Sequence, residues 1–293
     1  MFKGSLVALI TPMRPDGSVD EKAYADFVDW QIKEGTDAIV PVGTTGESPT
    51  LSHKEHGRVV EIAVEVAKGR VPVIAGAGSN DTRVAIQNIK ASKDAGADAA
   101  LMVPPYYNRP NQDGIFRHFE AVANSCDLPI ILYNVPGRTV TDIHVETMGR
   151  LAKTFPSIVG VKDATGIIQR VSAQRAACGT DFCQISGNDD MALAFNATGG
   201  RGCISVTANV APRLCAEFQA ACLAGDYGRA RDYQDRLFPL HVALFTDASP
   251  GPVKYALSRV KPDFPRTLRL PMTWPGEASQ RAVDSALEVA GLL

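Results

Sequence analysis

The residue with the most distinctive chemistry is a lysine inside an apolar strand. Lys162 lies in the run 158–164, a short β-branched segment of the kind that is buried on both faces of a parallel sheet. A lysine withdrawn from water loses its proton readily, and the free amine can attack a carbonyl carbon to form a Schiff base. The structural alternative is an ion pair with the neighbouring Asp163 or with a glutamate elsewhere in the chain.

Other residues with matching chemistry follow further apolar segments. Imine formation with a keto acid needs a group that carries protons and donors that bind the substrate carboxylate. Tyrosine can give and accept a proton, threonine hydroxyls can relay it, and an arginine can bind a second carboxylate through two parallel bonds. The segments that supply these residue types are Val42-Gly43-Thr44-Thr45-Gly46-Glu47, Pro104-Pro105-Tyr106-Tyr107-Asn108, Tyr133-Asn134-Val135-Pro136-Gly137-Arg138-Thr139 and 199–206.

The spacing of the apolar segments predicts the scaffold that brings these residues together. Eight short apolar strands alternate with helix-period segments, at intervals of roughly 20–35 residues, the length of a βα unit. This pattern predicts an α/β fold, a (β/α)8 TIM barrel, whose active face lies at the carboxyl ends of the strands. An open doubly wound sheet is the alternative, but the chain has no GxGxxG sequence and no P-loop. The predicted strands are 6–11, 38–42, 71–76, 99–103, 129–135, 158–164, 182–186 and 202–206.

Helix-capping residues and the end of the strand pattern indicate how the chain is divided. Asp20 and Asp142 each precede a helix-period segment, as N-cap residues do. After residue 206 the strand patterns stop, and the remaining sequence is helical in pattern. We therefore predict a catalytic barrel over 1–210 and a helical extension over 211–293 that packs on it.

Composition and charge exclude several classes of partner. The chain has 293 residues, 45% of them apolar and 21% charged, which is typical of a soluble globular protein. A net charge of −2 without a basic block gives no basis for nucleic acid or a membrane surface as a partner. No apolar run is long enough to span a membrane and no signal-peptide pattern is present. The six cysteines include no CxxC pair, so we expect reduced thiols and a cytoplasmic location.

Several motifs resemble those of a known family. The strings GTTGESPTL, PPYYNRP, YNVPGRT, GVKDATG and GGRGCISVTAN, followed by SPGPVKYAL and LRLPM, resemble the dihydrodipicolinate synthase family from Phe2 to the C-terminus. The wider group of pyruvate-dependent class I aldolases includes N-acetylneuraminate lyase and 2-keto-3-deoxy-sugar-acid aldolases, which resemble it in the barrel and the lysine. Arg138 of YNVPGRT resembles the arginine that the synthases use for their aldehyde substrate, whereas the sugar-acid branches generally have other residues there.

The resemblance implies a catalytic role for four residues. Lys162 would form the Schiff base with pyruvate. Tyr133 would donate and accept protons, and it would be linked through Thr44 to Tyr107 of a neighbouring subunit. The resemblance also implies a homotetramer built from two tight dimers, and no metal or organic cofactor.

Three further residues would bind the substrates. Thr45 and the backbone of Ile204 would hold pyruvate, and Arg138 would hold the carboxylate of L-aspartate 4-semialdehyde. The reaction implied is that of a lyase in lysine and diaminopimelate biosynthesis.

His53 and His56, three residues apart on a predicted helix, have three interpretations. They could form a solvated first turn, or they could bind a metal, although no third ligand is evident and the order is not HExxH. The resemblance adds a feedback site for lysine, which in some family members is lined by residues matching Ser48, His53, His56, Asn80 and Tyr106. Where lysine-sensitive relatives carry a glutamate, this chain has Val84. We therefore expect weak or absent lysine inhibition.

Three functions compete on these observations. The first is condensation of pyruvate with aspartate semialdehyde, and the second is cleavage of a sugar-derived 2-keto acid. The third is a non-catalytic sensor of keto acids or amino acids built on the same barrel. The joint presence of Lys162, Tyr133, Thr44 and Tyr107 favours an enzyme, since binding alone does not need a proton relay.

Overall fold

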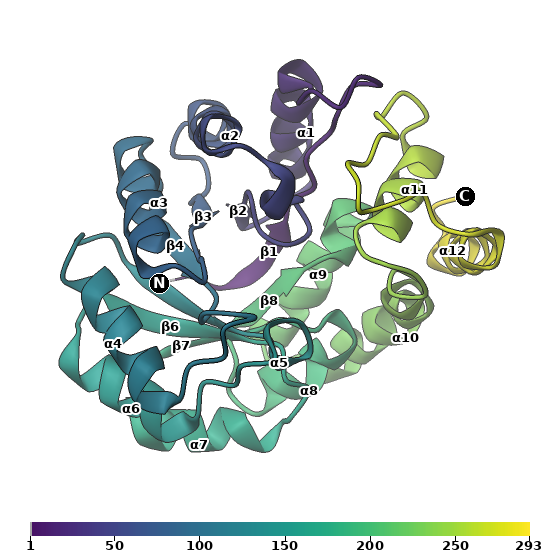
Figure 1. The fold of residues 1–293 in the computed structure, drawn as a ribbon. Coiled ribbons are helices and arrows are strands. Elements are labelled where there is room, and N and C mark those ends of the chain that lie inside the picture. Colours follow the sequence, from purple (N-terminus) through teal and green to yellow (C-terminus); the bar gives the residue numbers. More distant parts are fainter. Residues whose placement is uncertain (1) are drawn as a thin grey trace.

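The chain folds as a parallel eight-stranded barrel surrounded by helices, which confirms the predicted fold (Figure 1). The computed structural model describes residues 2–293. The strand order is β2-β1-β8-β7-β6-β5-β4-β3, and a parallel bridge between Ile39 of β2 and Val73, just before β3, closes the ring. The strands are β1 (Gly4–Ala8), β2 (Ala38–Val40), β3 (Ile74–Gly76), β4 (Ala99–Met102), β5 (Ile130–Asn134), β6 (Ile158–Asp163), β7 (Cys183–Ser186) and β8 (Gly202–Ser205).

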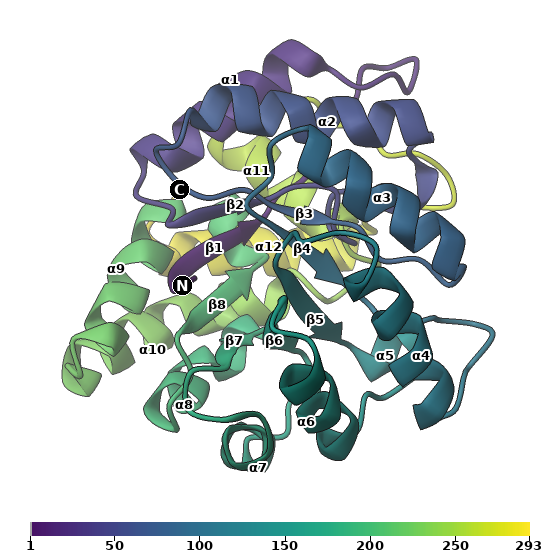
Figure 2. The ribbon, with the colours of Figure 1, turned by 90° about the vertical axis from the view of Figure 1, so that its left-hand side faces the viewer.

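Helices follow the strands and form the outer layer. Figure 2 shows the strands at the centre, with α1 and α2 along one side and α6 and α7 along the opposite side. The longer helices of this layer are α1 (Glu21–Lys33), α2 (His53–Ala67), α3 (Thr82–Asp94), α4 (Gln112–Ala123), α6 (Val145–Thr154), α7 (Gln169–Cys178), α8 (Ala192–Ala197) and α9 (Pro212–Leu223). The short turns between them are η1 (Ser48–Thr50), α5 (Pro136–Thr139), η2 (Asp189–Met191) and η3 (Thr207–Asn209).

Three further helices end the chain and lie outside the barrel wall, beside α1 and α9 (Figure 1). They are α10 (Tyr227–Ala243), α11 (Gly251–Val260) and α12 (Glu277–Ala290), and α10 packs against both α9 and α12. α9, which follows residue 210, contacts β1 and β8 directly.

The division of the chain at residue 210 stays a prediction. Within residues 2–293, no helix has the length and apolar character needed to cross a membrane.

The alternation of side chains along the strands creates two apolar layers. On β5, Ile131 and Tyr133 point into the barrel, where they pack with residues such as Leu6 of β1 and Ile204 of β8. The intervening Leu132 faces the outer helices and joins a second buried cluster. Residues that end a strand on its inward face therefore open directly onto the carboxyl face of the barrel. All six cysteines are free thiols, as predicted.

Two details differ from the sequence prediction. β1 spans Gly4–Ala8 instead of 6–11, because the chain leaves the sheet after Ala8 while its residues stay buried. Asp142 does not begin a helix. α6 begins at Val145, and the Asp142 carboxylate instead accepts a hydrogen bond from Asn134 at 2.6 Å. Asp20, by contrast, caps α1 as predicted, accepting from the backbone N–H of Ala23 at 3.0 Å.

Candidate active site

Lys162 and Tyr133 lie side by side inside the barrel. They are register partners on β6 and β5, with Lys162 5% exposed and Tyr133 9% exposed. The Nζ atom of Lys162 lies 4.2 Å from the centroid of the Tyr133 ring. The fold therefore brings the predicted nucleophile and the predicted proton carrier into contact.

The ion pair between Lys162 and Asp163 does not form. Adjacent residues of a strand point to opposite faces, so Asp163 faces the outer helices, where its carboxylate pairs with Arg170 at 3.1 Å. Among the residues that the structure describes, no aspartate or glutamate forms an ion pair with Lys162. A carboxylate in contact would hold an amine in its charged form, and the free amine is the species that attacks a carbonyl.

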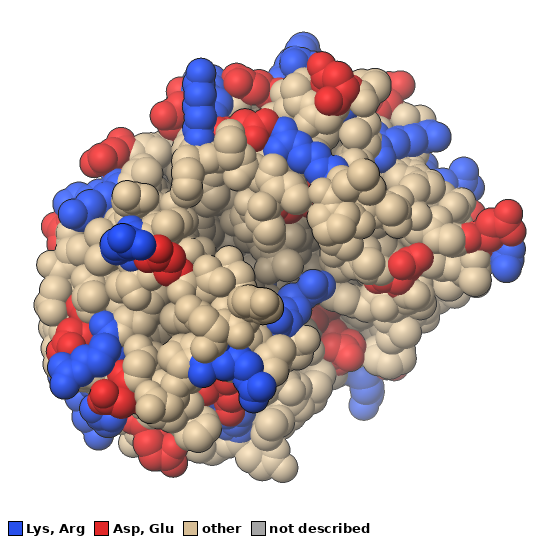
Figure 3. Space-filling view, in the orientation of Figure 1, with Lys and Arg blue, Asp and Glu red and all other residues tan. Residues whose placement is uncertain are grey.

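A cavity of about 450 Å³ opens at the carboxyl end of the barrel, and Figure 3 shows the molecule hollowed near the middle of this face. The cavity is lined by residues from the loops after β2, β3, β4 and β5. Of the predicted site residues, those that line it are Thr44, Ser48, His53, His56, Tyr106, Tyr133 and Arg138. The cavity therefore joins two of the four predicted catalytic residues, Thr44 and Tyr133, to four of the five predicted regulatory ones. Lys162 is not among its lining residues and lies behind Tyr133, deeper in the barrel.

The charges on the cavity wall favour anions. In the part of the chain that the structure describes, the lining contains no aspartate or glutamate, and Arg138 is its one Lys or Arg side chain. Arg138 lies on α5, directly after β5, and its side chain is exposed at the mouth. A guanidinium in this position suits a substrate carboxylate, which it can bind through two parallel hydrogen bonds.

The Thr44-Thr45 turn offers backbone donors beside the cavity. Thr44 lines the cavity and Thr45 is buried. The backbone N–H groups of Gly46 and Glu47 bond within the turn, to Gly43 and Thr44. Within residues 2–293 no acceptor pairs with the N–H groups of Thr44 and Thr45. Two adjacent free N–H groups and two hydroxyls form a suitable donor set for a carboxylate.

Close contacts and backbone strain shape the same turn. A Cβ atom at Gly46 would lie 2.9 Å from the carbonyl oxygen of Leu9, and one at Gly76 would lie 2.3 Å from that of Val42. Val42 itself has a φ of 48°, which is strained for a β-branched residue. Such strain costs about 1–3 kcal/mol per residue and concentrates where the surrounding structure fixes a functional conformation.

Tyr107 lies away from the cavity that Tyr106 lines. Its side chain is 90% exposed, and its φ of 71° is in the left-handed region. The loops after β4 and β5 are joined by the Thr141 hydroxyl, which donates to the carbonyl oxygen of Pro105 at 2.9 Å. Tyr107 is therefore held outward on an ordered loop, and it does not complete a site within its own chain.

The carboxyl end of β8 is held by a buried carboxylate for which the sequence indicated no role. Ile204 is fully buried in the barrel and is the register partner of Leu6. The Asp189 carboxylate accepts from the backbone N–H of Val206 at 2.8 Å and from the Ser205 hydroxyl. Asp189 thus fixes the backbone just after Ile204, the position predicted to hold pyruvate.

A second buried network ties the Thr44-Thr45 turn to the C-terminal helices. Glu47 is 3% exposed and pairs at 2.5 Å with Lys254 of α11, which is fully buried. Lys254 also donates to the carbonyl oxygen of Thr267 at 2.8 Å, and Glu47 accepts from the backbone N–H of Arg269 at 3.1 Å. Burial lowers the pKa of Lys254, and Glu47 acts against that shift. The sequence signal that we overlooked is a lone charge, Lys254, in an otherwise apolar helical run.

Replacing Lys254 by methionine is expected to destabilise the protein. The change leaves the Glu47 carboxylate buried without its cation, and breaking a buried pair in this way costs about 3–5 kcal/mol of unfolding free energy. The double variant with Glu47→Gln should be clearly more stable than Lys254→Met alone, because no unpaired charge remains. Urea unfolding at a fixed protein concentration measures both. Equal stability of Lys254→Met and the wild type would show that the pair contributes little.

The predicted regulatory residues come from several segments, namely the loops after β2, β3 and β4 and the start of α2. Ser48, His53 and Tyr106 line the cavity together with Val84 of α3. The ring nitrogen Nε2 of His56 lies 2.9 Å from the carbonyl oxygen of Gly76, and burial lowers the pKa of this histidine.

Asn80, the fifth predicted regulatory residue, lies in the loop after β3. Asn80 is half-buried and is not among the residues that line the cavity, and its backbone carbonyl oxygen accepts from the Asn108 amide at 2.9 Å. Across residues 2–293, no group of three or more His, Cys, Asp or Glu side chains is placed to hold a metal ion.

Known proteins resemble this chain over its whole length. Residues 1–290 match the dihydrodipicolinate synthetase family. Proteins described as 4-hydroxy-tetrahydrodipicolinate synthase from Rhizorhabdus wittichii and Agrobacterium fabrum are 65% and 59% identical, over 100% of each chain. A chloride-inhibited dihydrodipicolinate synthase from Acinetobacter baumannii, solved with pyruvate, is 45% identical with a TM-score of 0.97 over 100% of both chains. The enzyme from Cyanidioschyzon merolae, solved with lysine bound, is 36% identical with a TM-score of 0.96, covering 100% of this chain and 99% of that one.

Proposed function

Because the chain belongs to the dihydrodipicolinate synthetase family and functions as a 4-hydroxy-tetrahydrodipicolinate synthase, we propose that it condenses pyruvate with L-aspartate 4-semialdehyde through a Schiff base on Lys162. It is a lyase of lysine and diaminopimelate biosynthesis. The observation that carries the proposed mechanism is the buried Lys162 amine, which lies 4.2 Å from the centroid of the Tyr133 ring and, among the described residues, pairs with no carboxylate.

The proposed chemistry begins with attack of the Lys162 amine on the keto carbon of pyruvate. The carbinolamine then loses water to give the imine, and this step needs a proton on the departing oxygen. Tyr133 is the proposed donor and acceptor, because its ring contacts the amine. Thr44, which lines the same cavity, is the proposed next member of the relay. Tyr133 is proposed to accept a proton from the methyl carbon, which gives an enamine. The enamine carbon attacks the aldehyde carbon while the aldehyde oxygen takes up a proton. The amino group of the semialdehyde then attacks the imine carbon and displaces the Lys162 amine, which closes the ring and frees the enzyme.

The two substrates carry carboxylates that need separate donors. We assign the pyruvate carboxylate to the free N–H groups of the Thr44-Thr45 turn and to the backbone at Ile204. The carboxylate of the semialdehyde is assigned to Arg138, the one Lys or Arg side chain on the cavity wall within residues 2–293. The relative from Acinetobacter baumannii was solved with pyruvate, which supports pyruvate as a substrate of this chain. This chemistry needs no metal or organic cofactor, because the imine itself draws electrons from the neighbouring carbon.

We also propose that Tyr107 acts in a neighbouring subunit of a homotetramer built from tight dimers. Tyr107 is 90% exposed and Val140, on the adjoining loop, is 61% exposed. Both are held in left-handed conformations, with φ of 71° and 54°. An ordered loop that presents a tyrosine and a valine to solvent suits a contact with a second copy of the chain. A cytoplasmic location is proposed on the biosynthetic role of the relatives.

A substrate panel tests the proposed function directly. The purified enzyme should turn over pyruvate with aspartate semialdehyde and should show little cleavage of N-acetylneuraminate or 2-keto-3-deoxygluconate. Preferred cleavage of either sugar-derived acid would favour the second candidate function. Binding of pyruvate without turnover of any substrate would favour the sensor.

Lysine inhibition is expected to be weak or absent, and to tighten in Val84→Glu. A lysine ligand brings two ammonium groups, and the cavity wall within the described residues has no carboxylate to pair with them. One partly exposed charged contact contributes about 1–2 kcal/mol, or roughly 5–30-fold in affinity. Inhibition by free lysine, compared between wild type, Val84→Glu and Val84→Gln, checks this. A Val84→Glu enzyme no more sensitive than the glutamine control would show that the ammonium groups are satisfied elsewhere or that the site is unused.

A further inference from the structure

The residues that follow Lys162 and Tyr133 on their strands are also register partners. Asp163 follows Lys162 on β6, Asn134 follows Tyr133 on β5, and the two positions pair in the parallel ladder. Because side chains alternate, Asp163 and Asn134 face the outer helices directly behind the reactive pair. Asn134 is fully buried and Asp163 is 4% exposed. A shift of either side chain would therefore move the strand end that positions Lys162 or Tyr133.

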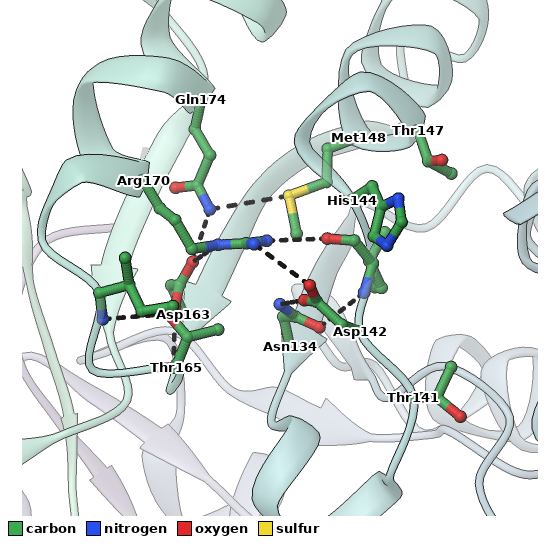
Figure 4. Close-up of polar contacts among 12 residues, drawn as sticks. Asn134, Thr141, Asp142, His144, Thr147, Met148, Asp163, Thr165, Arg170 and Gln174 are labelled. Atoms are coloured by element: carbon green, nitrogen blue, oxygen red, sulfur yellow. Dashed lines mark hydrogen bonds and ion pairs between the residues drawn. The ribbon is translucent and has the colours of Figure 1, made fainter.

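Asp163 is held by a dense set of donors from α7 and the loop before it (Figure 4). Its carboxylate accepts from Arg170 Nε at 3.1 Å and from Gln174 Nε2 at 2.5 Å. It also accepts from the backbone N–H and the hydroxyl of Thr165, at 2.9 and 2.6 Å. Charge-assisted bonds of this kind are strong and directional, so the end of β6 is fixed to α7.

Asn134 is held by the segment that follows α5. Its amide nitrogen donates to the Asp142 carboxylate at 2.6 Å, and its amide oxygen accepts from the backbone N–H of Ile143 at 2.9 Å. Both hydrogen-bonding groups of the side chain are thus engaged by two consecutive residues. The end of β5 is therefore fixed to segment 142–143.

One guanidinium joins these two halves. Arg170 Nη2 donates to the carbonyl oxygen of Ile143 at 2.7 Å, and Nη1 lies 3.4 Å from the Asp142 carboxylate. The same side chain contacts Asp163 through Nε and is only 12% exposed. Figure 4 shows Arg170 lying between Asp163 and Asp142, above Asn134. Arg170 therefore contacts both the carboxylate that supports the end of β6 and the segment that supports the end of β5.

Segment 142–143, which Arg170 contacts, lies close in sequence to Arg138, the residue proposed to bind the aldehyde substrate. Segment 142–143 begins only four residues after Arg138, and the chain between them is ordered by the Thr139 hydroxyl, which donates to the carbonyl oxygen of Thr141 at 2.8 Å. Movement of Asp142 or Ile143 would therefore shift the loop on which Arg138 stands.

We propose that Arg170 is a positioning residue for the condensation, which fixes the spacing of Lys162 and Tyr133 and the placement of Arg138. The proposal rests on the function proposed above and assigns a supporting residue to that same site. A geometric error of about 1 Å at a reacting centre can cost on the order of 10²-fold in rate. A rigid bridge between the two strand ends prevents such an error.

The role of Arg170 is tested by the rate per active site, so the fraction of active sites in each variant is measured first. Wild type, Arg170→Ala and Arg170→Lys are each titrated by exhaustive borohydride trapping of pyruvate, and kcat is expressed per trapped site. We expect kcat per site to fall about 10–100-fold in Arg170→Ala. Arg170→Lys should fall by a smaller factor, because one ammonium cannot bond Asp163, Asp142 and Ile143 in the geometry of the guanidinium fork. KM for pyruvate should change less than kcat in both variants.

A matched control lies on the same helix. Arg175 of α7 donates to the carbonyl oxygen of Thr198 at 2.9 Å and does not contact the bridge. Arg175→Ala should keep kcat per site within about twofold of wild type, because this half-buried side chain contacts neither strand end that carries the reactive pair. If Arg170→Ala fails to fold, Arg170→Lys alone decides the matter. An unchanged kcat per site in the folded Arg170 variants would overturn the proposal, since a merely structural role lowers only the number of active sites. Failure of wild type to trap pyruvate would instead reject the Schiff base itself.

Discussion

Lys162→Arg is expected to lose condensation activity by a factor on the order of 10⁴ or more while remaining folded. Arginine keeps the positive charge and much of the length of lysine, but it cannot be deprotonated in a protein. It therefore cannot supply the amine that attacks the keto carbon. Steady-state assays with pyruvate and aspartate semialdehyde measure the loss, and circular dichroism checks the fold.

Lys153→Arg provides the control for this variant. Lys153 is an exposed lysine near the end of α6, away from the cavity lining. Its replacement should leave the rate within about twofold of wild type. A Lys162→Arg enzyme with substantial activity would mean that the condensation does not proceed through this amine.

Arg138→Ala is expected to lower kcat/KM for aspartate semialdehyde by about 10²–10⁴-fold, while pyruvate trapping at Lys162 survives. Each charge-assisted hydrogen bond contributes roughly 1.5–3 kcal/mol, and a bidentate pair makes two of them. Steady-state kinetics with the semialdehyde varied at saturating pyruvate measure the loss. Trapping of pyruvate with borohydride shows whether the first half of the reaction is intact.

Arg83→Ala is the matched control, because Arg83 lies on α3 with its side chain 88% exposed and forms its ion pair with the nearby Asp81. It should behave as wild type in both assays. An unchanged kcat/KM in Arg138→Ala would contradict the assignment of the aldehyde carboxylate and would favour a sugar-acid aldolase.

The barrel could be predicted because its signal is local and repeated. Each of the eight strands overlaps a predicted apolar segment, since β-branched runs between turn residues mark buried parallel strands. The boundaries were less accurate, because an apolar run reports burial and not pairing. Residues 9–11 are buried but lie beyond β1, and the backbone N–H of Ile10 bonds to the Asn209 side chain at 3.0 Å.

One of the alternatives could have been excluded from the sequence alone. Lys162 and Asp163 are adjacent in a strand, so their side chains must point to opposite faces and cannot pair. The same alternation predicts that Asp163 and Asn134 face the helices behind the reactive residues. What the sequence could not provide is the identity of their partners, because Arg170 and segment 142–143 become neighbours only once β5, β6 and α7 are packed.

Long-range charge pairs were equally inaccessible. Glu47 and Lys254 are separated by 207 residues and belong to the barrel and the C-terminal helices respectively. No local pattern pairs them, although the charge of Lys254 within the apolar run 252–257 signals that a buried partner must exist. Exposure of Tyr107 was likewise set by the left-handed turn after β4, a conformation that residue type alone does not predict for tyrosine.

The proposed mechanism depends most on a Schiff base between pyruvate and the Lys162 amine, and borohydride trapping detects this bond directly. Wild-type enzyme is incubated with pyruvate and borohydride, digested with trypsin and analysed by mass spectrometry, with borohydride alone as the blank. We predict a reduced pyruvyl group on Lys162, on no other lysine, and in step with the loss of activity. Modification of a different lysine, or full inactivation without any adduct on Lys162, would contradict the account.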